Sequence, residues 1–252
     1  MRSGSSTRRP DDARRARSDA QPRTAHASRR GFTLIELLVV IGVIVVLIGI
    51  LVPTLSGARE SARRTRCLVN LQQIGVGTQL YMDSESQGVL PIVRPFQGGV
   101  PGGGSDPTLL EILQDYVDSP IPRRSSPDED FILGADSCYR CPSDRGGSDG
   151  PLWATAGVSY EYLPGLIMTG TELFFAVESP LVERTVTRAI ELQAEGGRPL
   201  PMLEDADDWH TGRATGRPRN AVYFPGMSAD WSRNYDTDLD DLFGSIGRIL
   251  GR

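Results

Sequence analysis

The chain has 252 residues, with 27 basic and 32 acidic side chains and a formal net charge of −5. This length leaves room for one anchor helix and one modest globular domain. The first 31 residues hold nine Arg and three Asp, a charge of +6, and the remainder holds 18 Arg against 29 acids, a charge of −11. An acidic remainder argues against sequence-independent DNA binding, which requires a cationic surface.

A long uncharged run follows the basic N-terminal segment. From Leu37 to Ala58 there are 22 residues without a charged side chain. As a helix at about 1.5 Å per residue, they span roughly 33 Å, enough to cross a hydrocarbon core of about 30 Å. The arginines before the run predict a cytoplasmic N-terminus and an exported C-terminal part. Glu36 stands at the edge of the run, where a carboxylate costs a few kcal/mol and therefore needs a functional reason.

Residues 29–36 read Arg-Arg-Gly-Phe-Thr-Leu-Ile-Glu and lead directly into the apolar run. This segment resembles the processing and polymerisation segment of type IV prepilins and of the pseudopilins of type II secretion. In that family a basic leader precedes Gly, Phe-Thr-Leu-Ile-Glu and a long apolar helix broken by one Pro, here Pro53. The resemblance implies that a prepilin peptidase removes residues 1–31, a disordered leader, by cutting between Gly31 and Phe32. It also implies methylation of the new α-amine.

The resemblance assigns assembly roles to Glu36 and Pro53. In a filament, the Glu36 carboxylate of one subunit would neutralise the Phe32 amine of its neighbour, and in a dry medium this pairing is worth more than a surface salt bridge. The implied partners are other pilin-like subunits, an inner-membrane assembly platform and membrane lipid. The implied function is that of a structural subunit of a type II secretion or type IV pilus-like filament, not that of an enzyme.

These features predict an α+β fold. We expect a transmembrane and polymerisation helix over residues 32–58, kinked at Pro53. An amphipathic continuation follows over 59–86. The loop-rich exported head over 87–252 contains a small antiparallel sheet. The continuation shows an apolar stripe at spacings of three and four residues. Its members are Cys67, Leu71, Ile74, Thr78 and Tyr81. Gly75 and Gly77 weaken this stretch by about 1 kcal/mol each.

Within the head, turn and capping residues divide the chain into further elements. The sequence predicts helices over 106–117, 179–195 and 239–250, strands over 131–133, 173–177 and 200–203, and a hairpin over 221–231. Two segments, Cys141-Pro-Ser-Asp and Ser159-Tyr-Glu-Tyr, resemble a pilin-like subfamily frequent in planctomycete-type bacteria. This second resemblance is looser than that of the N-terminus.

Three cysteines occur, at 67, 138 and 141. Export to an oxidising compartment permits a disulfide. The spacing Cys138-Tyr-Arg-Cys141 fits a disulfide between these two residues, half of a zinc site or a redox pair, and the sequence contains no second CxxC. Structural or free thiols are the favoured interpretation, and an odd number leaves one cysteine unpaired in a monomer.

One constellation of acidic residues with a histidine is the best candidate for metal chemistry. Carboxylates with an imidazole bind Ca²⁺ or a transition metal. The candidate ligands are Asp207, Asp208, His210 and Asp230, beside Glu204 and Asp205. Some pseudopilins carry a calcium ion in a loop of the head, but none of that loop's pattern is present here. The competing interpretation is a solvated acidic loop, with His210 as a structural residue.

Two other functions stay open. A signal peptidase could cut after Ser56-Gly57-Ala58 and release a soluble exported enzyme. Alternatively, the chain is a membrane-anchored binding protein that carries a pilin-type leader. Hydrolytic chemistry has little support because, beyond the leader, the chain contains a single histidine.

Overall fold

The computed structural model describes residues 32–93, 107–126, 129–146, 150–177, 179–210, 219–232 and 236–251. The chain forms two compact units, residues 1–49 and 50–252, which are treated separately below. The predicted leader, residues 1–31, lies outside the described residues, and so does the loop predicted around the glycines at 102–104.

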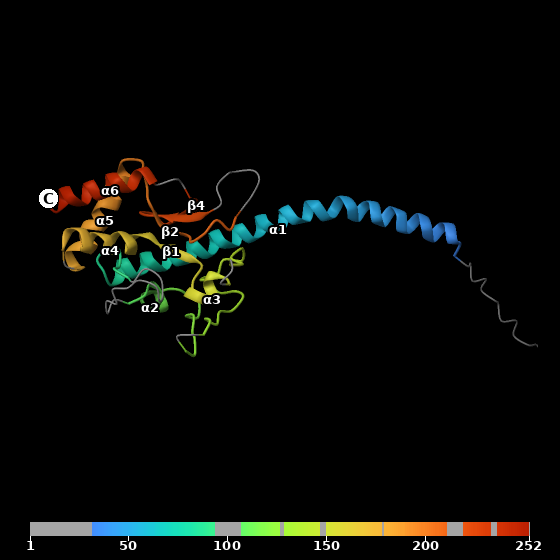
Figure 1. Cartoon of the computed structure of the whole chain (residues 1–252), viewed down its shortest axis with the longest axis horizontal. Coiled ribbons are helices and arrows are strands. Elements are labelled where there is room, and N and C mark those ends of the chain that lie inside the picture. Colours follow the sequence, from blue (N-terminus) through green and yellow to red (C-terminus); the bar gives the residue numbers. More distant parts are fainter. Residues whose placement is uncertain are drawn as a thin grey trace, which may run out of the picture. The chain divides into compact units, whose positions relative to one another are not determined.

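A single helix, α1 (Leu34–Ser84), begins in the first unit and ends in the second. It passes through Pro53 without interruption (Figure 1). Proline removes one backbone hydrogen bond but need not end a helix when the flanking residues favour it. The continuous helix predicted from the sequence is therefore confirmed, whereas the kink at Pro53 stays a prediction.

The C-terminal part of α1 forms the spine of the second unit. The residues of its predicted stripe are buried here, except that Tyr81 is half-buried. Gly75 and Gly77 are also buried, and each lies against a neighbouring side chain. A Cβ atom on Gly75 would come within 2.9 Å of Val222 Cγ1, and one on Gly77 would clash with Val117. The two glycines weaken the helix locally but allow it to approach the rest of the head closely.

The sheet contains four strands, all antiparallel, in the order β1 (Tyr160–Tyr162), β2 (Pro201–Asp205), β3 (Asn220–Tyr223) and β4 (Ser228–Trp231). The central strands β2 and β3 are buried along their whole length, whereas β4 is partly or fully exposed at every position. Glu161 pairs with Glu204, Ala221 with Asp230, and Val222 with Ala229. The predicted α+β class with a small antiparallel sheet is confirmed.

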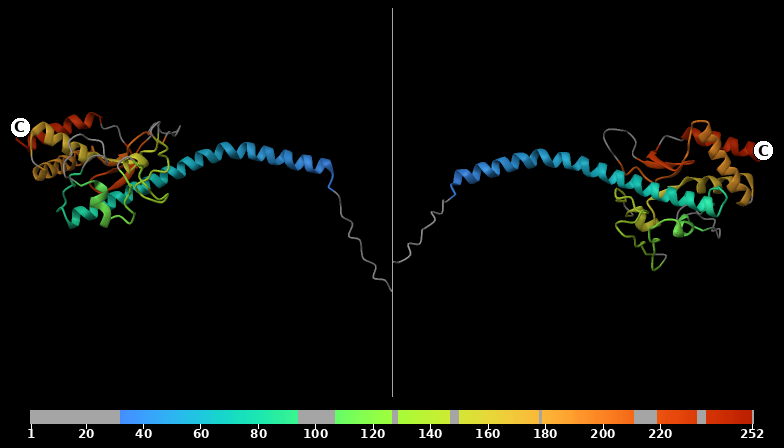
Figure 2. Two further views of the ribbon diagram at one scale, coloured as in Figure 1. Left: turned by 60° about the horizontal axis from the view of Figure 1, so that its bottom comes forward. Right: turned by 180° about the vertical axis from the view of Figure 1, so that it is seen from behind.

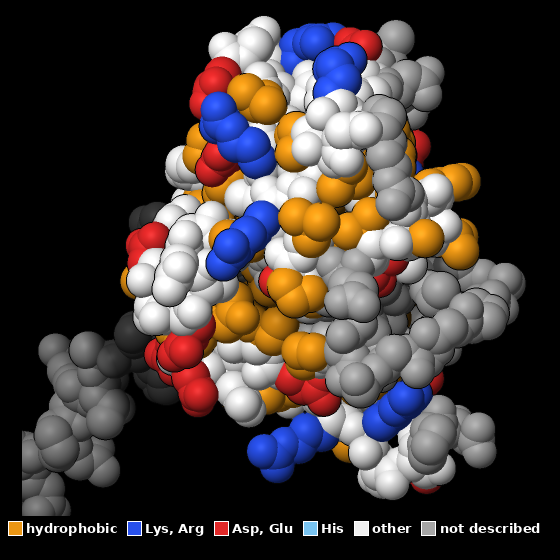
Figure 3. Space-filling model, turned by 90° about the vertical axis from the view of Figure 1, so that its left-hand side faces the viewer, with side chains coloured by type: hydrophobic (Ala, Val, Ile, Leu, Met, Phe, Trp, Pro, Cys, Tyr) orange, Lys and Arg blue, Asp and Glu red, His pale blue; other side chains and the backbone are white. Residues whose placement is uncertain are grey.

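The remaining helices surround this sheet and the end of α1 (Figures 1 and 2). They are α2 (Leu109–Ile112), the 3-10 turn η1 (Leu113–Asp115), α3 (Leu152–Ala156), α4 (Leu163–Phe175), α5 (Ser179–Glu195) and α6 (Asp236–Ile249). Helix α4 packs on β2 and α5, and α5 packs on α6. Figure 3 shows one face of this part, where apolar side chains lie among arginines and acids.

Several predicted elements are confirmed: the helix over 179–195, the strand at 200–203, the hairpin over 221–231 and the final helix. The predicted strand over 173–177 is wrong, because α4 continues to Phe175. Helix α4 buries Ile167, Met168 and Thr171 on one face, which explains why the exposed Leu173 and Phe174 follow as part of a helix.

Two shorter predictions are also corrected. Instead of a strand over 131–133, Ile132 forms only an isolated bridge with Arg123. The helix expected over 106–117 is limited to α2 and η1, and Thr108 caps it; Asp106, the predicted cap, lies outside the described residues. The Thr108 side chain accepts from the Glu111 backbone N–H, and the Glu111 carboxylate accepts from the Thr108 backbone N–H at 2.7 Å, which is a capping box.

Candidate functional site

The start of α1 carries the residues that the sequence marks for processing. Thr33 caps the helix, and Glu36 occupies the third helical position. Glu36 Oε2 accepts from the Thr33 backbone N–H at 2.9 Å and from Thr33 Oγ1 at 2.8 Å, while the Glu36 backbone N–H donates to Thr33 Oγ1 at 3.2 Å. These bonds form a second capping box, which fixes where the helix begins and directs the Glu36 carboxylate toward Phe32.

The apolar residues that follow are exposed on every side of the helix. Leu34, Ile35 and the Leu, Val and Ile side chains up to Ile48 are 47–83% exposed, and Phe32 is 75% exposed. A helix that is apolar all round requires an apolar surrounding, either a bilayer or other protein chains. By length and composition α1 can cross a membrane. Among the residues that the structure describes, nothing covers the apolar side chains over 34–49, so this surface is suited to contact with lipid or with other protein chains.

Residues 26–52 match the family model for the prokaryotic N-terminal methylation motif. The chain carries a prepilin-type N-terminus. This motif overlaps the apolar start of α1, and together they suggest a single-pass, membrane-anchored protein with a pilin-type precursor segment. No curated protein and no solved structure matches the chain. The looser resemblance to the planctomycete-type subfamily stays a prediction.

The motif explains why the processing segment combines these residue types. In the predicted cut, a small residue at 31 would give a protease access to the backbone, and the N-terminus expected at Phe32 stands four residues before Glu36. Gly31 itself lies outside the described residues. Processing by a prepilin peptidase and association with other pilin subunits follow from the motif.

A second group of functional side chains lies deep in the head. Cys67 on α1 and Cys141 form a disulfide, with their Cα atoms 5.2 Å apart and 74 residues apart in sequence. The predicted disulfide between Cys138 and Cys141 is wrong, and Cys138 is a free, buried thiol. A cross-link that closes a loop of this length is worth roughly 3–5 kcal/mol in chain-entropy models. The observed bond therefore ties α1 to the head, which a local Cys138–Cys141 bond could not do.

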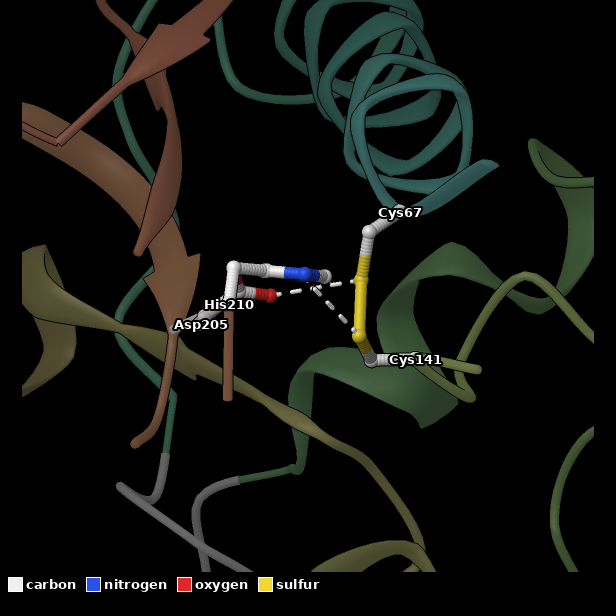
Figure 4. A group of neighbouring side chains, drawn as sticks. All are labelled: Cys67, Cys141, Asp205 and His210. Carbon is white, nitrogen blue, oxygen red and sulfur yellow. Dashed lines mark hydrogen bonds and ion pairs between the residues drawn. A yellow bond between two sulfur atoms is a disulfide. The ribbon is translucent and has the colours of Figure 1, made fainter. Parts of the chain in front are cut away.

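His210 and Asp205 complete this group (Figure 4). Asp205 ends β2, and His210 lies five residues further along the chain; both side chains are buried. His210 Nε2 lies 3.5 Å from Cys141 Sγ and 3.4 Å from Asp205 Oδ2, and Asp205 Oδ1 lies 3.4 Å from Cys67 Sγ. The group thus joins two sulfurs, one imidazole and one carboxylate from three parts of the chain: α1, the loop around Cys141, and the end of β2 with the residues that follow it.

The outer partners of the group hold its members in place. His210 Nδ1 lies 3.1 Å from Glu60 Oε1 on α1, and this oxygen also accepts from Ser143 Oγ at 3.0 Å. Asp205 Oδ2 accepts from the Asn220 backbone N–H at 2.7 Å and from Asn220 Nδ2 at 2.9 Å. These bonds fix the orientation of both the imidazole and the carboxylate.

The segment that carries Cys141 is positioned by a buried acid, Asp144. Its carboxylate accepts from the backbone N–H groups of Leu152 and Trp153, each at 3.1 Å, and from Ser159 Oγ at 2.7 Å. The Ser159 backbone N–H in turn donates to the Tyr139 carbonyl at 2.9 Å. The two segments of the looser resemblance, around Cys141 and around Ser159, therefore contact each other directly.

Burial and hydrogen bonding shift the pKa values of Asp205 and of its neighbour Glu60 in opposite directions. Burial raises the pKa of Asp205, although the bonds from His210 and Asn220 partly offset this rise. At Glu60 burial also acts to raise the pKa, but the hydrogen bonds from His210 and Ser143 outweigh it, so the pKa is lowered. Burial raises the pKa of the Cys138 thiol to about 11, which keeps this thiol protonated and unreactive at neutral pH.

The structure does not assemble the metal ligands predicted from the sequence. Asp207, Asp208 and Asp230 are exposed, and only His210 of the four lies in the buried group. Asp208 instead accepts from Arg219 Nε at 2.7 Å. Binding of Ca²⁺ stays an untested prediction, and the described geometry brings no second candidate ligand from that set to His210.

The pairing of Cys67 with Cys141 was not predicted from the sequence, and Asp205 was predicted beside His210 in the acidic constellation but not beside these cysteines. Spacing favoured Cys138 as the partner of Cys141 because the two are three residues apart, but only the packing of α1 on the head brings Cys67 near. One signal was present: Cys67 lies on the apolar stripe of α1, so its side chain had to point into the head.

Proposed function

We propose that this chain is a pilin-like or pseudopilin subunit that assembles into an envelope filament of a type II secretion or type IV pilus-like machine. A prepilin peptidase cuts it between Gly31 and Phe32, and an inner-membrane platform extracts it from the lipid bilayer. The head then faces the exported side. The observation that carries this proposal is the exposed apolar helix over 34–49, which lies within the methylation motif and begins at the Thr33–Glu36 capping box.

The capping box suggests how Glu36 acts. Within one chain it holds the carboxylate against the Thr33 backbone N–H at the N-terminal end of α1, one residue after the amine that the proposed cut would create at Phe32. Each hydrogen bond is worth about 0.5–1.5 kcal/mol. A cation from a neighbouring chain can therefore compete for Glu36 or share it, because charge pairing in an apolar medium exceeds these values. The box keeps the carboxylate ordered until a neighbour arrives.

A set of three variants separates the charge of Glu36 from its capping role. Glu36→Gln keeps a residue that also completes a capping box but removes the charge. Thr33→Ala removes the hydroxyl cap, at a cost of about 1 kcal/mol, and keeps the charge. We expect Glu36→Gln and Glu36→Ala to be processed but not assembled, whereas Thr33→Ala forms filaments. The measurement is the amount of sheared filament, with membrane-bound subunit as the reference.

The results distinguish the mechanisms. Normal filaments from Glu36→Gln would refute charge pairing. If Thr33→Ala is the only variant that loses its filaments, the role of Glu36 in assembly is helix capping. If the wild-type chain is itself processed and stable but never found in filaments, the result would favour a membrane-anchored binding protein.

The processing site has its own test. We expect Gly31→Val to leave the whole chain uncut, because a branched side chain blocks access to the backbone, while the wild type begins at N-methyl-Phe32. Mass spectrometry of the chain purified from the membrane fraction identifies its first residue and any methyl group on it. Efficient maturation of Gly31→Val, or a wild-type N-terminus at Arg59, would refute the assigned cut, and the latter would indicate release by a signal peptidase after Ala58.

A further inference from the structure

The buried group around the Cys67–Cys141 disulfide has the composition and spacing of a metal site. Its four side chains offer two sulfurs, one imidazole nitrogen and one carboxylate oxygen, all within 4.8 Å of one another and all buried (Figure 4). Zinc binds such ligands at about 2.3 Å for sulfur and about 2.0–2.2 Å for nitrogen and oxygen. In a tetrahedron, these lengths place neighbouring ligand atoms roughly 3.3–3.8 Å apart.

Three of the contacts already have this spacing. Cys141 Sγ lies 3.5 Å from His210 Nε2, His210 Nε2 lies 3.4 Å from Asp205 Oδ2, and Cys67 Sγ lies 3.4 Å from Asp205 Oδ1. Asp205 makes its two contacts with different oxygens, and the ligand atoms of all four side chains lie within 4.8 Å of one another. The two sulfurs, which are covalently joined, must separate to about 3.8 Å for a zinc ion to lie between the four side chains.

The imidazole is oriented as a metal-bound histidine is. Its Nδ1 lies 3.1 Å from Glu60 Oε1 and donates to this carboxylate. Its Nε2 faces Cys141 Sγ and Asp205 Oδ2, the side from which a metal ion held by these residues would approach. A carboxylate behind a histidine is the usual outer partner in zinc sites.

We propose that, when the disulfide is reduced, Cys67, Cys141, His210 and Asp205 bind one Zn²⁺ ion, so that either a disulfide or a metal ion joins α1 to the head. The soft thiolates select a transition metal over Ca²⁺, and a mixed sulfur and nitrogen tetrahedron is typical of zinc. The site is structural, because four protein ligands fill the tetrahedron and the group is closed to solvent.

The conversion is a two-electron reduction by an external dithiol. The sulfur–sulfur bond of Cys67–Cys141 breaks, the two sulfurs of the reductant form a disulfide, and its two protons end on Cys67 and Cys141. Zn²⁺ then displaces these protons into solvent as the thiolates bind. Both forms cross-link the same elements, so α1 stays attached to the head whichever closes the site.

The test uses the full chain in detergent. One sample is reduced with a dithiol, separated from it without oxygen, given Zn²⁺ and desalted; another is kept oxidised. We expect about one zinc per chain in the reduced sample only, and with Co²⁺ the visible bands of a tetrahedral ion together with thiolate-to-cobalt charge transfer. Near-ultraviolet circular dichroism follows the packing of the head in every sample.

Variants assign the ligands. His210→Gln leaves the disulfide able to form and should lose the metal, while Cys138→Ser, which changes the free thiol outside the group, should retain it. Glu60→Gln should weaken zinc binding about 10–100-fold by removing the outer partner of His210.

Every outcome decides the proposal. If the reduced head loses its packing and Zn²⁺ restores it, the proposal is supported as strongly as by direct binding. A reduced head that stays packed with no more zinc than the oxidised sample overturns the proposal, and so does one that unfolds without rescue by Zn²⁺. Cobalt bound without charge transfer, or metal lost in Cys138→Ser but kept in His210→Gln, also overturns it.

Discussion

Two parts of one helix behave differently. Residues 34–49 of α1 are exposed on all sides and apolar on all sides, whereas residues 67–82 bury one stripe and leave polar side chains elsewhere. The first part has no apolar partner among the described residues of its own chain. The second is covered by the sheet and by the segment around Val117.

A carboxylate in each region shows the same contrast. Glu36 is bound by Thr33, three residues away, and its bonds would form in any chain with this local sequence. Glu60 is bound by Ser143 and His210, which are 83 and 150 residues away. The structure of the N-terminal part of α1 therefore depends on local residues, and its apolar surface is left for other molecules to cover. The apolar stripe of the C-terminal part is covered by the head of the same chain.

The largest effect expected from this contrast is on stability. Leu71→Ala removes a side chain that is 0% exposed and should lower the free energy of unfolding of the head by about 2–5 kcal/mol. Leu47→Ala, at a position that is 61% exposed, should change it by less than about 0.5 kcal/mol. Thermal unfolding of the full chain in detergent, followed by near-ultraviolet circular dichroism, compares the two. Equal losses would mean that the N-terminal part also packs on the head.

A smaller effect is expected at the glycines. Gly75→Ala places a Cβ atom 2.9 Å from Val222 Cγ1 and should destabilise the head by about 1–3 kcal/mol, although alanine favours a helix. Its matched control is Gly57→Ala, where nothing lies within 4 Å and the gain in helix propensity should be up to about 1 kcal/mol. The same unfolding assay measures both. A stabilising Gly75→Ala would show that the close approach of α1 to β3 is not required.

The smallest effect concerns pH. Because hydrogen bonds from His210 and Ser143 lower the pKa of Glu60 in the folded chain, this group stabilises the head above its unfolded pKa of about 4.3. That contribution is lost as the pH falls through the lower, folded value. Glu60→Gln should therefore flatten the decline of stability below about pH 4.3, measured as the difference in unfolding midpoint from the wild type. Parallel curves would show that the Glu60 contacts contribute nothing to folding.

The sequence predicted an element correctly where the residues that determine the element are close to one another in the chain. The continuous α1, the hairpin with Pro225-Gly226 at its turn, and helix α5 ended by Gly197 in a left-handed conformation all depend on neighbouring residues. The strand predicted over 173–177 was wrong for the opposite reason. A short apolar run is equally compatible with a strand and a helix, and contacts of α4 with β2 and α5 decide for the helix.

The sequence alone determined the N-terminal chemistry of this protein. The proposed cleavage and methylation depend on an enzyme that recognises a short segment, and membrane insertion depends on a run of apolar residues, so the order of residues 26–52 is sufficient to predict them. The tertiary structure alone decided the site in the head. Cys67, Cys141, Asp205 and His210 span 143 positions between the first and the last, and no spacing rule relates them. They meet because α1, β2 and the loop held by Asp144 pack together, and packing depends on burial of side chains from the whole chain.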